Sequence, residues 1–148
     1  MPITVRDASA ADAVAVVHLV AELADSEAWP LELTEEYVPA YLGFPGTHVL
    51  LAEQDGRAVG LLAYSLRPGL FHGGEIGYIE EVVVAPAARR TGVATQLLRL
   101  AMQRMKECGC KEVSLSVGFH NTEAQRLYRS LGLTEESLLL ERHLYPPG

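Results

Sequence analysis

A turn with small and basic residues is the segment whose types and spacing most clearly predict chemistry. Arg89 and Arg90 precede Gly92 and Ala94, and the turn follows an apolar run that ends at Val84. The first N–H groups of a helix lack intrahelical partners, and the helix dipole places partial positive charge there. Gly92 and Ala94 would let phosphate oxygens approach this backbone, and the arginines would add charged donors. The spacing predicts an anion site where the next helix begins.

Two kinds of phosphate ligand are excluded by what the turn lacks. A P-loop would continue into Lys followed by Ser or Thr, and this turn does not. The three-glycine fingerprint of dinucleotide-binding folds is also missing. A nucleoside triphosphatase and a dinucleotide-binding enzyme are therefore not predicted.

Apolar periodicity and turn residues predict the elements that must position this turn. Strands are expected over residues 3–7, 48–53, 58–66, 76–84, 112–117 and 137–144. Helices are expected over residues 13–23, 34–42, 92–107 and 121–130. Ser9 with Asp12 resembles a capping box, and Asp55-Gly56 is a strong hairpin signal.

The element order β-α-α-β-β-β-α-β-α-β predicts one α/β domain over residues 1–148. The hairpins of the first half should be antiparallel, and the strand–helix–strand unit in the middle should be parallel. A mixed, mostly antiparallel sheet with helices on both faces is the expected fold.

Composition excludes several classes of protein. The 148 residues carry a formal net charge of −7, so the basic face of a nucleic-acid binder is not expected. No run approaches the ~18 apolar residues of a membrane span, and no secretory signal is recognised, so a cytoplasmic protein without a membrane partner is expected. Cys108 and Cys110 suit reduced thiols, and the scattered histidines predict no metal site.

The turn and a later pattern resemble the GCN5-related N-acetyltransferase (GNAT) family. The spacing R-x-x-G-x-A, from Arg89 to Ala94, is similar to that family's pyrophosphate-binding motif. Its later pattern N-x-x-A-x-x-x-Y-x-x-x-G-F is matched at Asn121, Ala124, Tyr128 and Gly132, with Leu133 in place of the usual Phe. The element order matches as well, and the resemblance covers essentially the whole chain.

The resemblance implies the GNAT fold, in which two central strands separate at their ends, and it implies acetyl-CoA as acetyl donor with CoA as product. The pantetheine arm would lie against Val82, Val83 and Val84. Asn121 would help to orient the cofactor. The backbone around the pyrophosphate would come from Arg89, Arg90, Gly92, Val93, Ala94 and Thr95.

The resemblance also implies catalytic roles, because an alkyl ammonium must lose a proton before it attacks and the departing thiolate must gain one. Glu80 is the expected base, acting through a water molecule. Glu81 could share that role or bind a substrate cation, because neighbours on a strand face opposite sides. Tyr128 is the expected general acid. The backbone N–H of Val82 or Val83 would polarise the thioester carbonyl.

The acceptor is expected near the first two helices and the loop over residues 71–77, where carboxylates and aromatic faces would favour a cation. The candidate residues are Trp29, Glu75, Tyr78 and Glu81. The strand start Tyr-Ile-Glu-Glu is similar to that of diamine and spermidine acetyltransferases, so a polyamine-like primary amine is the leading expectation. Carboxylates on two exposed helices would produce the same composition without any such role.

Three functional readings remain open at this point. The first is a small-molecule N-acetyltransferase. The second is a peptide or protein N-acetyltransferase, and the third is an acyl-CoA-binding sensor without catalysis. A homodimer is a further expectation, because the leucine-rich stretch 138–144 could pair or exchange between two chains.

Overall fold

The computed structural model describes residues 2–145, which fall into two compact units. The N-terminal unit is Met1–Leu115 and the C-terminal unit is Ser116–Gly148. Glu80 and the predicted anion turn belong to the N-terminal unit, whereas Asn121 and Tyr128 belong to the C-terminal unit. Among the described residues, no helix is long and apolar enough to cross a membrane.

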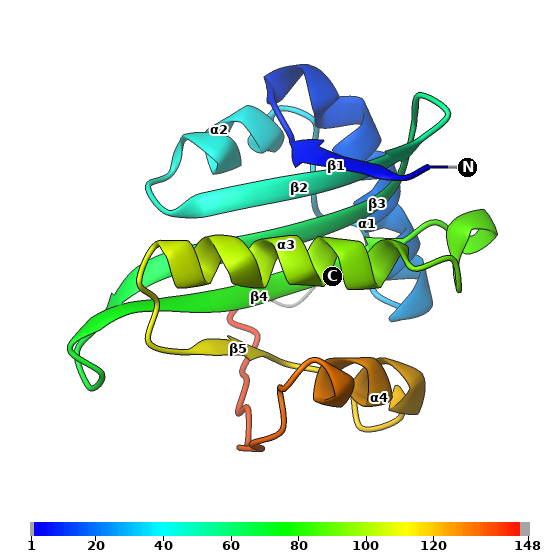
Figure 1. Ribbon diagram of the computed structural model, residues 1–148. Coiled ribbons are helices and arrows are strands. Elements are labelled where there is room, and N and C mark those ends of the chain that lie inside the picture. The colour runs from blue at the N-terminus through cyan, green and yellow to red at the C-terminus, as the bar shows by residue number, and fades with distance from the viewer. Residues whose placement is uncertain (1, 146–148) are drawn as a thin grey trace. The chain divides into compact units, whose positions relative to one another are not determined.

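The N-terminal unit is built on a five-stranded sheet in the order β1-β2-β3-β4-β5 (Figure 1). Its strands are β1 (Thr4–Asp7), β2 (Thr47–Gln54), β3 (Arg57–Gly69), β4 (Gly74–Val84) and β5 (Val113–Leu115). Neighbours from β1 to β4 run antiparallel, and β5 runs parallel to β4. The mixed, mostly antiparallel sheet is therefore confirmed.

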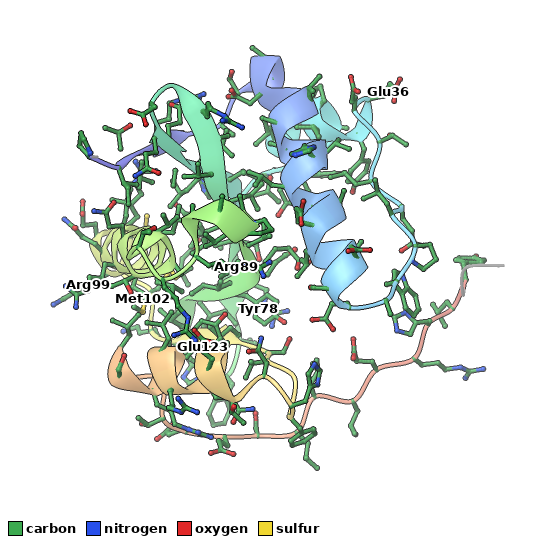
Figure 2. The ribbon with its side chains drawn as sticks, turned by 90° about the vertical axis from the view of Figure 1, so that its right-hand side faces the viewer. Glu36, Tyr78, Arg89, Arg99, Met102 and Glu123 are labelled. Atoms are coloured by element: carbon green, nitrogen blue, oxygen red, sulfur yellow. The ribbon has the colours of Figure 1, made fainter. Side chains whose placement is uncertain are left out.

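Helices cover both faces of this sheet, as the sequence predicts. They are α1 (Ala13–Ser26), α2 (Tyr37–Gly43) and α3 (Val93–Glu107). α3 lies on one face, and α1 lies on the other (Figures 1 and 2). The alternation of side chains along β3 explains the two layers, because Leu61 and Ala63 pack in the cluster that contains Val16 and Leu19 of α1, while Leu62 points to the opposite face.

The hairpin between β2 and β3 has the turn that its sequence predicts. Asp55 and Gly56 both have positive φ, at 53° and 73°. This is the pattern of a two-residue turn whose twist matches the strands. The next hairpin is longer than expected, because pairing continues to Gly69 and Gly74 through residues predicted to form a loop.

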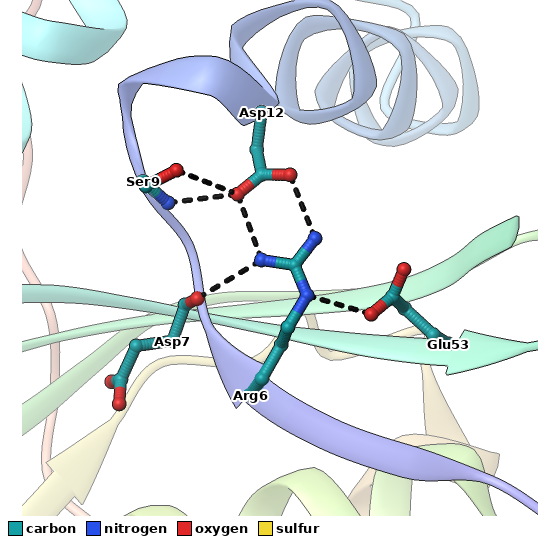
Figure 3. A network of polar contacts seen from close by, with 5 residues as sticks. All are labelled: Arg6, Asp7, Ser9, Asp12 and Glu53. Carbon is teal, nitrogen blue, oxygen red and sulfur yellow. Dashed lines mark hydrogen bonds and ion pairs between the residues drawn. The ribbon is translucent and has the colours of Figure 1, made fainter. Parts of the chain in front are cut away.

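Arg6 ties β1 to β2 and to the segment that starts α1 (Figure 3). Its guanidinium donates to Glu53 at 2.6 Å and to both oxygens of Asp12 at 2.9 and 2.8 Å. Asp12 also accepts from the backbone N–H of Ser9 at 2.8 Å, which confirms the capping box, here around the short 3-10 turn η1 (Ala10–Asp12). The arginine lowers the pKa of Asp12 to about 2.

The C-terminal unit contains α4 (Thr122–Ser130) followed by a segment without regular structure. The expected strand over residues 137–144 is not formed, and this part of the prediction is wrong. A strand needs a partner edge, and no such pairing exists among the described residues. The leucines that suggested it are exposed instead, with Leu138 at 81% and Leu140 at 87%.

Candidate active site

β4 has a bulge at its acidic pair. Ala63 of β3 pairs with Glu81, whereas the next residue, Tyr64, pairs with Ile79, so Glu80 is an extra residue in β4. A bulge breaks the side-to-side alternation of a strand and redirects the side chains around it. Ile79 is buried opposite Tyr64, while Glu81 lies opposite Ala63 of the α1 cluster. The simple alternation assumed for Glu80 and Glu81 does not hold at this position.

Tyr41 of α2 shares its electrostatic environment with this acidic pair. Its hydroxyl is buried and has no hydrogen-bond partner among the described residues. Burial raises the pKa of Tyr41 to about 12, with further contributions from Glu80, Glu81 and Tyr37. The phenol therefore keeps its proton at neutral pH. A buried polar group without a partner calls for an explanation, and a bound ligand or water is a direct one.

The sequence analysis did not identify Tyr41. The available signal was the spacing of Tyr37 and Tyr41, four residues apart and therefore on one face of α2. Their rings lie 6.4 Å apart. That spacing shows a shared helix face but not the proximity of Glu80 and Glu81, which are about 40 residues away in the sequence and come near only through the fold.

Glu81 lies among further negative charge. Surrounding protein atoms raise the pKa of its carboxyl, and Glu80 and then Glu27 add like charge. The residue is nonetheless exposed, so solvent partly screens these charges. Glu27 is the C-cap of α1, where the helix dipole is also negative. The arrangement attracts a cation to the surface between β4 and the end of α1.

The start of α3 has the free amides of an anion site. Gly92 is its N-cap with φ 88°, and the first intrahelical bond runs from the Gln96 N–H to the Gly92 carbonyl at 3.1 Å. The N–H groups of Val93, Ala94 and Thr95 consequently have no intrahelical acceptor. A left-handed conformation at Gly92 costs little because glycine has no Cβ.

Close packing of α3 on the sheet fixes the position of these amides. A Cβ at Gly60 of β3 would come 2.5 Å from Cγ1 of Val93 and 3.2 Å from Cδ1 of Leu97, so only glycine permits this approach. At the other end of α3, a Cβ at Gly77 of β4 would lie 2.5 Å from the sulfur of Met105. Two glycines therefore hold the helix close to the sheet along its length.

The two arginines of the turn differ in their surroundings. Arg89 is exposed, and its Nε donates to the carbonyl of Val84 at 3.2 Å, so its side chain folds back to the end of β4. Arg90 is exposed and has φ 64°, which is uncommon for a residue with a Cβ. The hydroxyl of Thr91 donates to the carbonyl of Ala88 and stabilises the turn.

β4 continues past its partner β5. The parallel pairs join Gly77, Tyr78 and Ile79 to β5, which ends at Leu115, while β4 runs on to Val84. Beyond the bulge, the four residues from Glu81 to Val84 are paired on one side by β3 and are not paired by β5. The edge of β4 away from β3 is therefore not covered by β5 over these residues.

The direction of the backbone groups on this edge follows from the antiparallel register. The N–H of Ala85 donates to the carbonyl of Val59 on the β3 side at 2.8 Å. Residues facing and not facing the partner alternate along an antiparallel pair, so Val83 also faces β3. Val82 and Val84 face the other way. The N–H groups of Val82 and Val84 therefore lie on the edge away from β3, where Arg89 donates to the Val84 carbonyl.

The expected acceptor residues do not all come together. Tyr78 pairs with Ser65 of β3 and with Ser114 of β5. It lies two residues before Glu80, the extra residue of the bulge. Glu75 lies near the start of β4, about 16 Å from Glu80 along the strand at ~3.3 Å per residue. The exposed loop around Phe71 is at that same distant end.

Trp29 follows the end of α1, and its indole N–H donates to Glu32 at 3.2 Å. Its backbone N–H donates to the carbonyl of Ala24 at 2.9 Å, which holds the residue against the last turn of α1. Trp29 is thus two positions beyond Glu27 and 37% exposed. It therefore lies near Glu27, which adds negative charge to the surroundings of Glu81.

Two predicted site residues are on α4 of the C-terminal unit. Asn121 is the N-cap of α4, and its side chain accepts from the N–H of Ala124 at 3.3 Å. Tyr128 lies near the other end of the helix, and burial raises the pKa of its phenol. Asn121 therefore has a structural role in starting α4, and Tyr128 is a protonated phenol at neutral pH.

A separate hollow exists elsewhere in the N-terminal unit and contains none of these residues. Its volume is about 410 Å³, and its lining is Asp7, His48, Tyr64, Leu66, Arg104, Glu107 and Cys108. Within residues 2–145, no group of three His, Cys, Asp or Glu side chains is arranged to hold a metal ion. The acid–amide arrangement of β4 and α3 remains the candidate active site.

Comparisons with known proteins identify the family and the fold of the chain. The model of the Acetyltransferase (GNAT) family matches residues 17–133. An aminoglycoside N(6')-acetyltransferase type 1 of Acinetobacter haemolyticus is 37% identical over 89 residues, covering 58% of this chain and 61% of that protein. The aminoalkylphosphonate N-acetyltransferase of Salmonella typhimurium (strain LT2) is 30% identical over 129 residues, covering 86% of this chain and 83% of that protein.

A solved structure shows the same fold over almost the whole chain. The crystal structure of a transcriptional regulator from Bacillus halodurans C-125 superposes with a TM-score of 0.85 and 28% identity, covering 97% of this chain and all of the other. The family match spans the β4 edge, the turn and α3 as well as the pattern on α4. The chain belongs to the Acetyltransferase (GNAT) family.

Proposed function

We propose that this protein is an N-acetyltransferase that moves the acetyl group of acetyl-CoA to a primary amine of a small, cationic molecule. The observation that carries the proposal is the continuous arrangement at the end of β4, where the free edge at Val82 leads into the free amides that begin α3. A thioester on a phosphate-bearing carrier fits such a site, because strand edges pair with amide groups and helix N-termini bind phosphate.

Residues of this chain would hold acetyl-CoA as follows. The edge of β4 from Val82 to Val84 pairs with the amide groups of the pantetheine arm. The N–H groups of Val93, Ala94 and Thr95 bind the pyrophosphate. Arg90 and Arg89 supply positive charge at the rim, and Asn121 supports the cofactor by starting α4. Bound in this way, the thioester supplies an activated acetyl group.

The chain's own groups then move the protons. The pair Glu80 and Glu81 accepts a proton from the substrate ammonium. The freed amine attacks the carbonyl carbon, which the N–H of Val82 polarises. As the C–N bond forms and the C–S bond breaks, Tyr128 donates its proton to the sulfur. The proton that the attacking nitrogen then loses restores the phenol, which leaves a neutral amide and CoA.

The negative charge of the site indicates which kind of acceptor molecule it would bind. Glu27, Glu80 and Glu81 provide negative charge, and Tyr41 adds a hydroxyl that has no hydrogen-bond partner within residues 2–145. This negative charge favours molecules with several amines, such as polyamines or aminoglycosides, and disfavours an aminoalkylphosphonate, whose anionic group would be repelled.

We place the reaction in the cytoplasm, since Cys108 and Cys110 are free thiols of the kind that reducing compartments maintain. We also propose that the enzyme is a homodimer.

The test is CoA release from acetyl-CoA with a panel of polyamines, aminoglycosides, aminoalkylphosphonates, amino acids and short peptides, with products identified by mass spectrometry. We expect acetylated polyamine or aminoglycoside. If only peptides were acetylated, the acceptor would be the terminus of a peptide or protein rather than a small molecule. Tight acetyl-CoA binding with no acetylated product in any class would support a sensor, and absence of acetyl-CoA binding would overturn the proposal.

A further inference from the structure

The turn that ends α3 carries the two cysteines of the chain, with one residue between them. Cys108 is the C-cap of the helix and is exposed, Gly109 follows it with φ 81°, and Cys110 is partly buried. Both are free thiols of the N-terminal unit, and the proposed acetyl transfer uses neither. Two thiols at such a short spacing can do chemistry that one cannot, because the second can displace a group bound to the first.

Hydrogen bonds hold the backbone of this turn on both sides. The N–H of Gly109 donates to the carbonyl of Lys106 at 3.0 Å. The N–H of Cys110 donates to the carbonyl of Met105 at 2.9 Å, which completes the Schellman pattern that closes a helix. The N–H of the next residue donates to the carbonyl of Glu75 of β4 at 2.7 Å. The turn is therefore tied both to α3 and to the sheet, which fixes the spacing of the two cysteines.

This spacing suits a disulfide. A fully extended chain would place the two Cα atoms at most ~7.2 Å apart, at ~3.6 Å per residue, and the left-handed conformation of Gly109 brings them closer. Cα atoms joined by a disulfide are usually ~4.4–6.8 Å apart. The thiols are also near enough to influence each other, because burial raises the pKa of Cys110 and the neighbouring Cys108 raises it further.

The two thiols differ in how a small molecule can reach them. Cys108 lines the hollow of about 410 Å³ described above, together with Arg104 and Glu107, and Cys110 is not part of that lining. The hollow gives a small disulfide room beside the sulfur of Cys108. Its side chains of both charges suit the carboxylate and ammonium groups of a peptide disulfide. Cys108 is therefore the expected first attacker, since the reactivity of a thiol follows its exposure.

We infer that Cys108 and Cys110 are a redox-active dithiol that exchanges with small peptide disulfides, such as oxidised glutathione, and closes to an internal disulfide. The thiolate of Cys108 attacks one sulfur of the small disulfide, forms a mixed disulfide and releases one thiolate. The thiolate of Cys110 then attacks the sulfur of Cys108 and releases the second. The small disulfide is reduced by two electrons to two thiols, which take up the two protons that the cysteines lost. The inference does not depend on the acetyl-transfer proposal.

The internal disulfide should exchange readily. It closes a small ring over Gly109, within a turn whose backbone is already held by hydrogen bonds. Strained or exposed disulfides are easier to reduce than buried structural ones. A reducing compartment would therefore keep the pair as free thiols, and a rise in small disulfides would oxidise it.

The test is to expose the reduced protein to oxidised glutathione, stop the exchange with acid at intervals, and follow the mass of the intact protein without reductant. Wild-type protein should pass through a mixed disulfide and end with the loss of two hydrogen atoms, and closure should not depend on protein concentration. Cys110→Ser should stop at the mixed disulfide with one glutathione. Cys108→Ser should react about tenfold more slowly, because the less exposed thiol must attack.

A relocated pair is the matched control. Lys106→Cys combined with Cys110→Ser again places two thiols two positions apart, at residues 106 and 108. On a helix, residues at this spacing do not face each other, so the pair should collect mixed disulfides without internal closure. Circular dichroism establishes that each variant is folded.

Three outcomes would contradict the inference. Wild-type protein that stops at a mixed disulfide overturns it, and so does a disulfide that joins two chains on a non-reducing gel. Internal closure at the wild-type rate in the relocated pair would overturn the role assigned to the turn at Gly109. Internal closure in wild-type protein alone, reversed by added reduced glutathione, supports the redox-active dithiol.

Discussion

The chemistry of the candidate site depends on how three carboxylates and one phenol influence each other. Burial is the main cause that raises the pKa of both Glu81 and Tyr41. Glu80 and Glu27 raise that of Glu81 further, and both carboxylates of β4 raise that of Tyr41 further. A carboxylate with a raised pKa is a stronger base, and a phenol with a raised pKa remains a hydrogen-bond donor. The bulge at Glu80 makes this coupling possible, because it changes the direction of the side chains on either side.

The first prediction concerns the base. A general base must be ionised, so kcat/KM should fall as pH decreases through its pKa, and the raised pKa of Glu81 moves that fall to higher pH than for an ordinary carboxyl. Glu81→Gln should lower kcat by 10²–10⁴ and remove the acidic limb of the pH–rate profile. Glu80→Gln, measured alongside, identifies which member of the pair accepts the proton. Survival of the acidic limb in both variants would place the base elsewhere.

The second prediction concerns Tyr41. Because its hydroxyl has no partner among the described residues, Tyr41→Phe should leave the melting temperature unchanged or slightly raised. The loss of one hydrogen bond to the acceptor or its water should reduce kcat/KM for the amine by about 2–13-fold, mainly through KM. Thermal melting and steady-state kinetics measure both effects. A lower melting temperature with unchanged kinetics would assign the hydroxyl a structural role.

At the scale of elements, the site depends on how α3 is held on the sheet and how β1 is tied to the start of α1. The first contact is steric and the second is electrostatic, so they respond to different perturbations. Gly60 permits close packing of Val93 beneath the amides of α3. Arg6 joins β1, β2 and the capping residue Asp12.

The third prediction is that Gly60→Ala weakens acetyl-CoA binding and stability together. The new Cβ would stand 2.5 Å from the Val93 side chain, so the first turn of α3 must shift. Overpacking of this kind typically costs about 1–3 kcal/mol. Urea unfolding and calorimetric titration with acetyl-CoA provide the measurements. Gly43→Ala is the matched control, since its added Cβ would have no atom within 4 Å; equal effects at both glycines would exclude packing of α3 as the cause.

The fourth prediction follows from the lowered pKa of Asp12. Its folded value is about 2 and its ordinary value is 3.8, so the stabilisation is fully present above about pH 4 and is lost as pH falls toward 2. Asp12→Asn should therefore be less stable than wild type at pH 6, with a difference that shrinks as pH approaches 2. Chemical denaturation at several pH values measures it. Asp25→Asn on α1 serves as control, and a difference independent of pH would show that the ion pair is not its source.

At the scale of the whole molecule, the chain belongs to the Acetyltransferase (GNAT) family and has two compact units. The N-terminal unit contains the amides that begin α3 and the acidic residues Glu27, Glu80 and Glu81, and the C-terminal unit contains Tyr128. The net charge of −7 matches a cationic acceptor but works against an anionic cofactor at long range. Local donors at the start of α3 must therefore provide the cofactor affinity.

The fifth prediction is that acetyl-CoA stabilises the whole protein. At a concentration one hundred times its dissociation constant, binding adds about 2.7 kcal/mol, which corresponds to a rise in melting temperature of about 5–10 °C for a chain of this size. Arg89→Ala should reduce the rise at fixed ligand concentration. Arg99→Ala should not, because Arg99 is exposed on α3 and points away from the sheet (Figure 2). An absent rise in wild-type protein would argue against the proposed cofactor.

Local signals in the sequence were sufficient for most of the fold. Capping by Ser9 and Asp12, the Asp-Gly turn and the glycine at the start of α3 each depend on residues within a few positions of one another. The sheet's mixed direction also followed from the order of elements. The family pattern was readable for the same reason, since its residues lie in short, regularly spaced segments.

The tertiary structure decided what depends on pairing between distant segments. The bulge at Glu80 exists only in the register with β3, and so does the choice of Val82 over Val83 as the free N–H. Tyr41 and Glu27 come near Glu81 only when α1 and α2 cover the sheet. Residues 137–144 have the composition of a strand, but a strand forms only beside another strand, and the residues of this stretch do not specify which one.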